Sequence, residues 1–250
     1  MRAPDWLTSR PIAHRGLHDH ARGIIENMPG AIRAAIAGKF AIEVDIQLTA
    51  DGEAMVYHDD ELGRLTEGSG ALRARTVAEL KQVVFKDTPE RMMSLADLCA
   101  LVAGRVPLVI EVKSHFDGST RLVRRMAEVL SGYDGLAAGM SFDPDQVMAM
   151  RELMPSRPRG IVAERHYAKA DWPEASSRQR AAMTHLRHAF RTRPHFVAYN
   201  VNELPALAPW ISRNIFRCPL LTWTVRTAQQ RARADRYADQ MIFEGFYPNA

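Results

Sequence analysis

Short apolar segments typical of β-strands alternate with amphipathic segments typical of α-helices along the whole chain. The alternation recurs about every 30 residues, so that roughly eight strand–helix units fit into the sequence. Strands separated by helices form a parallel sheet, because each helix returns the chain to the start of the next strand. Eight such units in 250 residues favour a closed (β/α)8 barrel, the TIM barrel, over an open doubly wound sheet.

One stretch departs from this alternation. Residues 41–49 form a regular strand pattern, and the Asp51-Gly52 pair predicts a tight turn into a further strand at 54–59. Residues 59–93 are less regular and too short to own a core, so we expect a small insertion after the second strand. The whole chain, 1–250, is then a single domain.

In the second half of the chain, residues 177–190 are expected to form one helix.

The composition and charge of the chain exclude several classes of protein. The chain is 46% hydrophobic and 25% charged, with a net charge of +4, which excludes a disordered chain and favours an anionic partner. The Arg-rich segments 178–193 and 226–236 lack nucleic-acid-binding motifs, and no Gly-rich nucleotide motif follows a strand. Neither a signal peptide nor a membrane-length apolar run is recognisable. We therefore expect a cytoplasmic protein with no nucleic-acid partner and no stable membrane insertion; its oligomeric state is left open.

Ionisable residues gather where the predicted strands end, which is where TIM-barrel active sites lie. Two of the strands carry such residues at positions i and i+2, so that both side chains point to the same side. The set comprises His14, Arg15, Glu43, Asp45, His58, Glu111 and Lys113.

Three of these residues, Glu43, Asp45 and Glu111, are carboxylates that would repel one another unless a cation lay between them. Oxygen ligands suit one hard divalent ion, Mg²⁺ or Ca²⁺, with Mn²⁺ as an alternative. The remaining cations are suited to a phosphate, and the two histidines have pKa values suited to proton transfer. The set indicates phosphoryl-ester hydrolysis more than acyl transfer, for which no G-x-S-x-G motif is present.

A series of motifs resembles the glycerophosphodiester phosphodiesterase family. These are IAHRG (12–16), Glu26-Asn27, IEVDIQLTADG (42–52), VYHDDELGRLTEGSG (56–70) and IEVKS (110–114), followed by weaker similarity to the last strand. The resemblance implies a TIM barrel that hydrolyses glycerophosphodiesters to sn-glycerol 3-phosphate and an alcohol.

The resemblance also implies roles for individual residues. Glu43, Asp45 and Glu111 match the metal ligands, His14 and His58 the acid–base pair, and Arg15 and Lys113 the phosphate contacts. Glu26 and Asn27 match a P-E-N-T motif near the substrate, and Trp223 matches an aromatic residue that walls the glycerol side. The chain departs from the family in that motif, which reads I-E-N-M, and in its last strand, FEGFYP.

Two other functions stay open on the sequence alone. One is a phosphodiesterase of the same superfamily that acts on phospholipid or lysophospholipid head groups. The other is a non-catalytic binding barrel, which is disfavoured because none of the candidate residues has been lost. Water and the glycerol 2-hydroxyl are both candidate nucleophiles.

Overall fold

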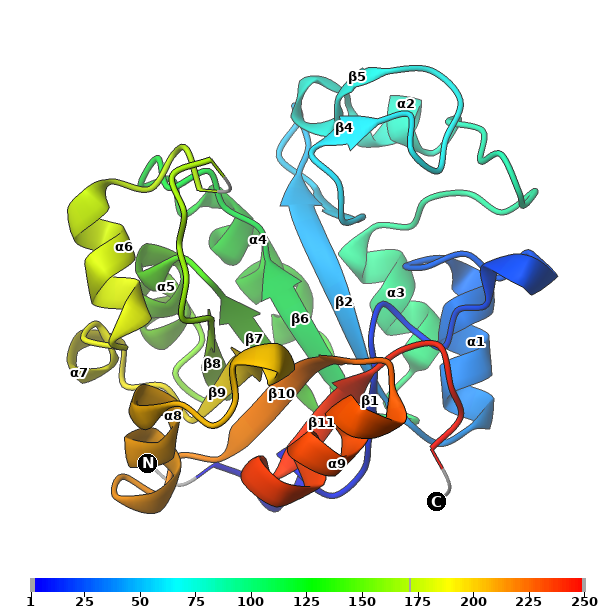
Figure 1. Cartoon of the computed structure of the whole chain (residues 1–250). Coiled ribbons are helices and arrows are strands. Elements are labelled where there is room, and N and C mark those ends of the chain that lie inside the picture. Colours follow the sequence, from blue (N-terminus) through cyan, green and yellow to red (C-terminus); the bar gives the residue numbers. More distant parts are fainter. Residues whose placement is uncertain (1–2, 171, 249–250) are drawn as a thin grey trace. The chain divides into compact units, whose positions relative to one another are not determined.

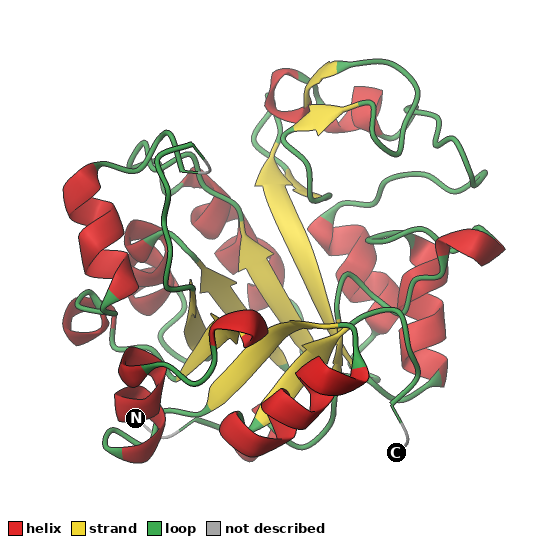
Figure 2. Cartoon of the chain, viewed as in Figure 1, coloured by secondary structure: helices red, strands yellow, loops and turns green. Residues whose placement is uncertain are grey.

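Nine strands form one sheet in the order β1-β11-β10-β9-β8-β7-β6-β2-β3, and β1 also pairs with β2. The pairing of β1 with β2 closes the sheet and leaves β3 outside the ring. The computed structural model describes residues 3–170 and 172–248. Figures 1 and 2 show that helices alternate with the strands of this ring along the chain. This strand order confirms the predicted (β/α)8 TIM barrel.

The strands of the ring are β1 (Ile12–Ala13), β2 (Ala41–Leu48), β6 (Leu108–Val112), β7 (Ala137–Ser141), β8 (Arg159–Ala163), β9 (Phe196–Asn200), β10 (Leu220–Val225) and β11 (Gln240–Phe243). The helices are α1 (Pro29–Ala37), α2 (Val77–Leu80), α3 (Leu95–Val102), α4 (Arg121–Ser131), α5 (Pro144–Leu153), α6 (Ser177–Thr184), α7 (Ala189–Thr192), α8 (Leu207–Asn214) and α9 (Ala228–Tyr237). Across the described ranges, no helix combines the length and apolarity needed to cross a bilayer.

The chain divides into two compact parts. The N-terminal part consists of Ala13–Lys113 and Thr120–Ala137, and the C-terminal part of Met1–Ile12, Ser114–Ser119 and Ala138–Ala250.

In the N-terminal part, the strands β2 and β6 pair in parallel register. Strand β2 is buried on both faces, although its sequence alternates between apolar and polar residues. At its end the chain turns back at Asp51-Gly52 into β3 (Ala54–Val56), which pairs antiparallel with β2. The polar residues of β2 are therefore buried, and they need partners inside the protein.

The insertion contains a small hairpin, β4 (Glu61–Leu62) and β5 (Gly70–Ala71), and the short helix α2. Figure 1 shows this segment in cyan beyond the end of β2. Its apolar side chains belong to a buried cluster that also includes Ile25, Met28, Met55 and Tyr57 from outside the insertion. The insertion therefore packs against the two loops that carry Glu26 and His58.

In the C-terminal part, β8, β9, β10 and β11 pair in parallel in that order. The prediction of one helix over 177–190 is wrong: α6 ends at Thr184 and α7 begins at Ala189. Between them Leu186 adopts a left-handed backbone with φ of 53° and buries its side chain. Core burial thus overrides the helical pattern of the sequence.

Candidate active site

Three buried carboxylates, Glu43, Asp45 and Glu111, come together on β2 and β6. In the parallel register of these strands Asp45 is paired with Glu111. Glu43 precedes Asp45 by two residues, so it projects from the same face of β2. The three residues each offer an oxygen atom, and these atoms all lie within 4.8 Å of one another.

This proximity is electrostatically costly without a cation. Burial, together with the charges of Asp45 and Glu111, raises the pKa of Glu43 well above its ordinary value. Three carboxylate oxygens at this spacing are the donor set that a hard divalent ion prefers. The network contains five carboxylates and three permanent cations. With every carboxylate ionised, the excess is two negative charges, which equals the charge of one divalent ion. The carboxylates are those of Glu26, Glu43, Asp45, Asp59 and Glu111, and the cations are Arg15, Arg64 and Lys113.

Lys113 partly compensates the carboxylates. Its Nζ lies 2.8 Å from Asp45 Oδ1 and 2.7 Å from Glu111 Oε1. Burial would lower the pKa of Lys113, but these two carboxylates raise it above its ordinary value. Burial would likewise raise the pKa of Asp45, but the nearby positive charges, led by Lys113, hold it well below its ordinary value. Lys113 and Asp45 are therefore both charged.

Arg15 lies in a turn directly after β1 that wraps around Glu43. The backbone N–H of Arg15 donates to Glu43 Oε2 at 3.0 Å, and its Nε lies 3.3 Å from Asp45 Oδ2. Both Arg15 and Gly16 adopt left-handed backbone conformations, with φ of 55° and 80°. A Cβ on Gly16 would lie 2.9 Å from the carbonyl carbon of Ala31 in α1, so only glycine fits here without a shift.

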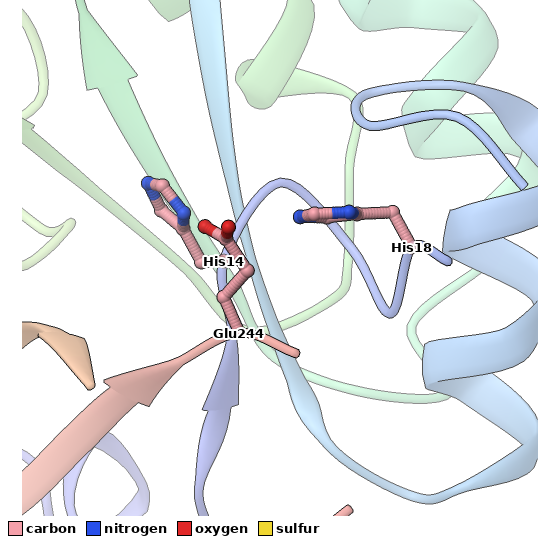
Figure 3. Close-up of side chains that lie close together, drawn as sticks. All are labelled: His14, His18 and Glu244. Carbon is pink, nitrogen blue, oxygen red and sulfur yellow. The ribbon is translucent and has the colours of Figure 1, made fainter. Parts of the chain in front are cut away.

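His14 precedes this turn, and its Nε2 lies 4.0 Å from Glu43 Oε2. Figure 3 shows the imidazole of His14 and that of His18, which follows on the same loop. His14 is thus placed beside the three carboxylates by the end of β1.

His58 follows β3, which pairs with the end of β2. The backbone N–H of the preceding residue, Tyr57, donates to the carbonyl of Asp45 at 3.1 Å. The Nδ1 of His58 lies 2.8 Å from Asp59 Oδ1, and Asp59 in turn accepts two hydrogen bonds from Arg64. A carboxylate on Nδ1 favours the tautomer that leaves Nε2 available for proton transfer.

Glu26 and Asn27 complete the network. Arg64 and Arg15 both donate to Glu26, and although burial alone would raise the pKa of Glu26, these bonds lower it to about 2. Asn27 is buried in a left-handed conformation with φ of 59°, and its Nδ2 donates to Asp45 Oδ2 at 3.0 Å.

The structure thus brings together nine of the ten residues singled out in the sequence, all in the N-terminal part: His14, Arg15, Glu26, Asn27, Glu43, Asp45, His58, Glu111 and Lys113. The tenth, Trp223, lies on β10 in the C-terminal part. There its Nε1 donates to the carbonyl of Ala198 at 3.0 Å, and its ring meets that of Phe142 edge-on.

Sequence reasoning did not assign roles to Asp59 and Arg64. Both residues stand within the motif VYHDDELGRLTEGSG, which was therefore a usable signal. Arg64 contacts Glu26, 38 residues away in the sequence, and no periodic pattern predicts such a contact.

The Gly16 turn can be tested by substitution. Gly16→Ala and Gly68→Ala place a side chain at nearly the same φ, 80° and 79°, but only Gly16 has a neighbour within 4 Å. We expect Gly68→Ala to lower the free energy of unfolding by about 1–2 kcal/mol from backbone strain alone. Gly16→Ala should lower it by a further ~1–3 kcal/mol through overlap with Ala31. Urea denaturation measures both, and equal losses would contradict the close approach to α1.

Comparison with known proteins identifies relatives of the chain. The chain is 26% identical to the YhdW protein of Bacillus subtilis (strain 168) over 259 aligned residues, covering 95% of this chain and 98% of YhdW. It is 36% identical over 111 residues to a glycerophosphodiester phosphodiesterase of Caldanaerobacter subterraneus subsp. tengcongensis, covering 41% of this chain and 44% of that protein.

Among solved structures, the fold is similar to that of an Oleispira antarctica phosphodiesterase in complex with the product sn-glycerol-3-phosphate. The TM-score is 0.76 at 18% identity, covering 98% of this chain and 94% of that one. The model of the glycerophosphoryl diester phosphodiesterase family matches residues 14–246, a span that contains every residue of the site described above. The chain belongs to the glycerophosphoryl diester phosphodiesterase family.

Proposed function

We propose that this enzyme hydrolyses glycerophosphodiesters to sn-glycerol 3-phosphate and an alcohol with one divalent cation held by Glu43, Asp45 and Glu111. Hydrolysis of glycerophosphodiesters is the activity of the family. The observation that supports the cation site is the geometry of these three buried carboxylates, which each offer an oxygen atom within 4.8 Å of the others. A bound divalent ion, Mg²⁺, Ca²⁺ or Mn²⁺, supplies a positive charge that stabilises a developing negative charge on a phosphoryl oxygen.

The chain's own cations are suited to bind the phosphodiester. Arg15 Nε lies 3.3 Å from Asp45 Oδ2, and Lys113 Nζ lies 2.8 Å from the other oxygen, Oδ1. A guanidinium and an ammonium group next to the metal ligands attract an anionic substrate and orient its non-bridging oxygens. Glu26 holds the Arg15 guanidinium through a 2.7 Å ion pair.

The two histidines are suited to move the protons that hydrolysis requires. The nucleophile, water or the glycerol 2-hydroxyl, loses a proton to one imidazole as its oxygen bonds to phosphorus. The bond between phosphorus and the alcohol oxygen breaks, and the other imidazole gives that oxygen a proton. With the 2-hydroxyl as nucleophile, a cyclic phosphate forms first. Water then opens it, losing a proton to one imidazole while the other imidazole gives a proton to the 2-oxygen. His14 follows β1 and His58 follows β3, and both of these strands pair with β2, which carries Glu43 and Asp45.

Release of glycerol 3-phosphate tests the proposed function. Glycerophosphocholine, -ethanolamine and -glycerol are incubated with the enzyme, and a coupled assay detects the product. We expect release with Mg²⁺, Ca²⁺ or Mn²⁺, loss of activity in EDTA, and recovery when excess metal is restored, because the carboxylates repel one another without a cation. Full activity in EDTA would refute the metal requirement. Exclusive turnover of lysophospholipids would instead favour a lipid head-group phosphodiesterase.

Substitution of the histidines tests proton transfer. His14→Ala and His58→Ala should each lower kcat by about 10²–10⁴-fold, since each removes one proton-transfer group. The thermal unfolding midpoint should change little, because both side chains keep some solvent exposure, 12% and 32%. His185→Ala, at an exposed position in the C-terminal part, is the control and should keep the wild-type rate. Near-normal turnover in either test variant would exclude that histidine from catalysis.

A further inference from the structure

We propose that Arg64 is a positioning residue that links the proton-transferring histidine His58 to the phosphate-binding residue Arg15. All three nitrogens of its guanidinium are engaged by two carboxylates. Nε and Nη2 donate to the two oxygens of Asp59 at 2.6 and 3.0 Å. Nη2 and Nη1 donate to the two oxygens of Glu26 at 2.7 and 3.2 Å.

One arm of this network reaches His58. Arg64 occupies both oxygens of Asp59 and thereby fixes the rotamer of that carboxylate. Asp59 Oδ1 lies 2.8 Å from His58 Nδ1. The plane of the imidazole and the tautomer it adopts are therefore set through Asp59 by the position of Arg64.

The other arm reaches Arg15. Glu26 Oε1 accepts from Arg64 Nη2 and from Arg15 Nη1, both at 2.7 Å. Arg15 lies in turn against Asp45. A shift of Glu26 would therefore move the guanidinium that is proposed to contact the phosphate.

The insertion holds Arg64 in place. The neighbouring residues Leu62 and Leu65 are buried in the apolar cluster that also contains Tyr57 and Ile25, which directly precede His58 and Glu26. Lys86 Nζ donates to the carbonyl of Gly63 at 2.5 Å. The insertion thus presents one side chain to both catalytic loops.

Stability alone does not explain this arrangement. The Arg64 side chain is 47% exposed, and exposed ion pairs contribute little to the free energy of folding. A planar guanidinium group that binds two carboxylates at once fixes their orientation, and the ammonium group of a lysine cannot do this. The consequence should therefore appear in catalysis more than in stability.

The inference rests on the proposed function, and kinetics of single variants separate the two arms. Arg64→Met should lower kcat about tenfold or more and also raise KM. Asp59→Asn should lower kcat alone, and Glu26→Gln should chiefly raise KM. Arg64→Lys should behave like Arg64→Met, because the planar guanidinium group is lost although the positive charge remains. Arg73→Met, at an exposed position in the same insertion, is the matched control and should leave both parameters unchanged.

A double variant distinguishes positioning from a general structural effect. In a His58→Ala background, Arg64→Met should lower kcat by less than about twofold, because the group it orients is already gone. An unchanged penalty in that background, or wild-type kinetics for Arg64→Met alone, would overturn the proposal.

A nuclear magnetic resonance measurement keeps the test independent of turnover. The ¹⁵N shifts of the His58 imidazole should report one tautomer in the wild-type protein and a mixture in Arg64→Lys and Arg64→Met. Unchanged shifts in folded variants would contradict the link. If the wild-type enzyme released no glycerol 3-phosphate, the proposed function would fail while these shifts still decided the role of Arg64.

Discussion

The mutual repulsion of three buried carboxylates is the constraint on which the site depends. At an effective dielectric constant of about 20, two unit charges 4.8 Å apart repel by roughly 3 kcal/mol, and Glu43, Asp45 and Glu111 lie within that spacing of one another. Nearby residues offset part of this cost: Lys113 bridges Asp45 and Glu111, and the Arg15 turn donates to Glu43. Burial, together with the charges of Asp45 and Glu111, nevertheless keeps the pKa of Glu43 above its ordinary value. Under the proposed function, a divalent cation held by the three carboxylates offsets the remaining repulsion.

The site is built on regular strands but is organised by irregular segments. Strands β2 and β6 fix the carboxylates through their register, whereas the histidines stand where β1 and the segment after β3 leave regular structure. The insertion joins these segments through a shared apolar cluster and through the Arg64 guanidinium. Contacts outside the barrel strands therefore hold the two loops that carry Glu26 and His58.

Much of this could be predicted from the sequence because it follows from periodicity. The strand–helix alternation predicted the barrel, and the i, i+2 spacing of Glu43 and Asp45 predicted a shared face. The contacts of Arg64 could not be predicted in this way, since they depend on how an aperiodic segment folds back over 38 residues. The break between α6 and α7 was missed because burial of Leu186, not local propensity, decides it.

Glu43, Asp45 and Glu111 are proposed to hold one divalent cation together. Calorimetric titration of the metal-free protein with Mg²⁺ and Ca²⁺ tests it most directly, without any substrate. We expect one ion per chain, bound at least about tenfold more weakly by Glu111→Gln. Glu128→Gln, which alters a carboxylate that is 57% exposed on α4, should leave the affinity unchanged. Binding of equal strength in Glu111→Gln, or no binding to the wild-type protein, would contradict a cation site formed by the three carboxylates.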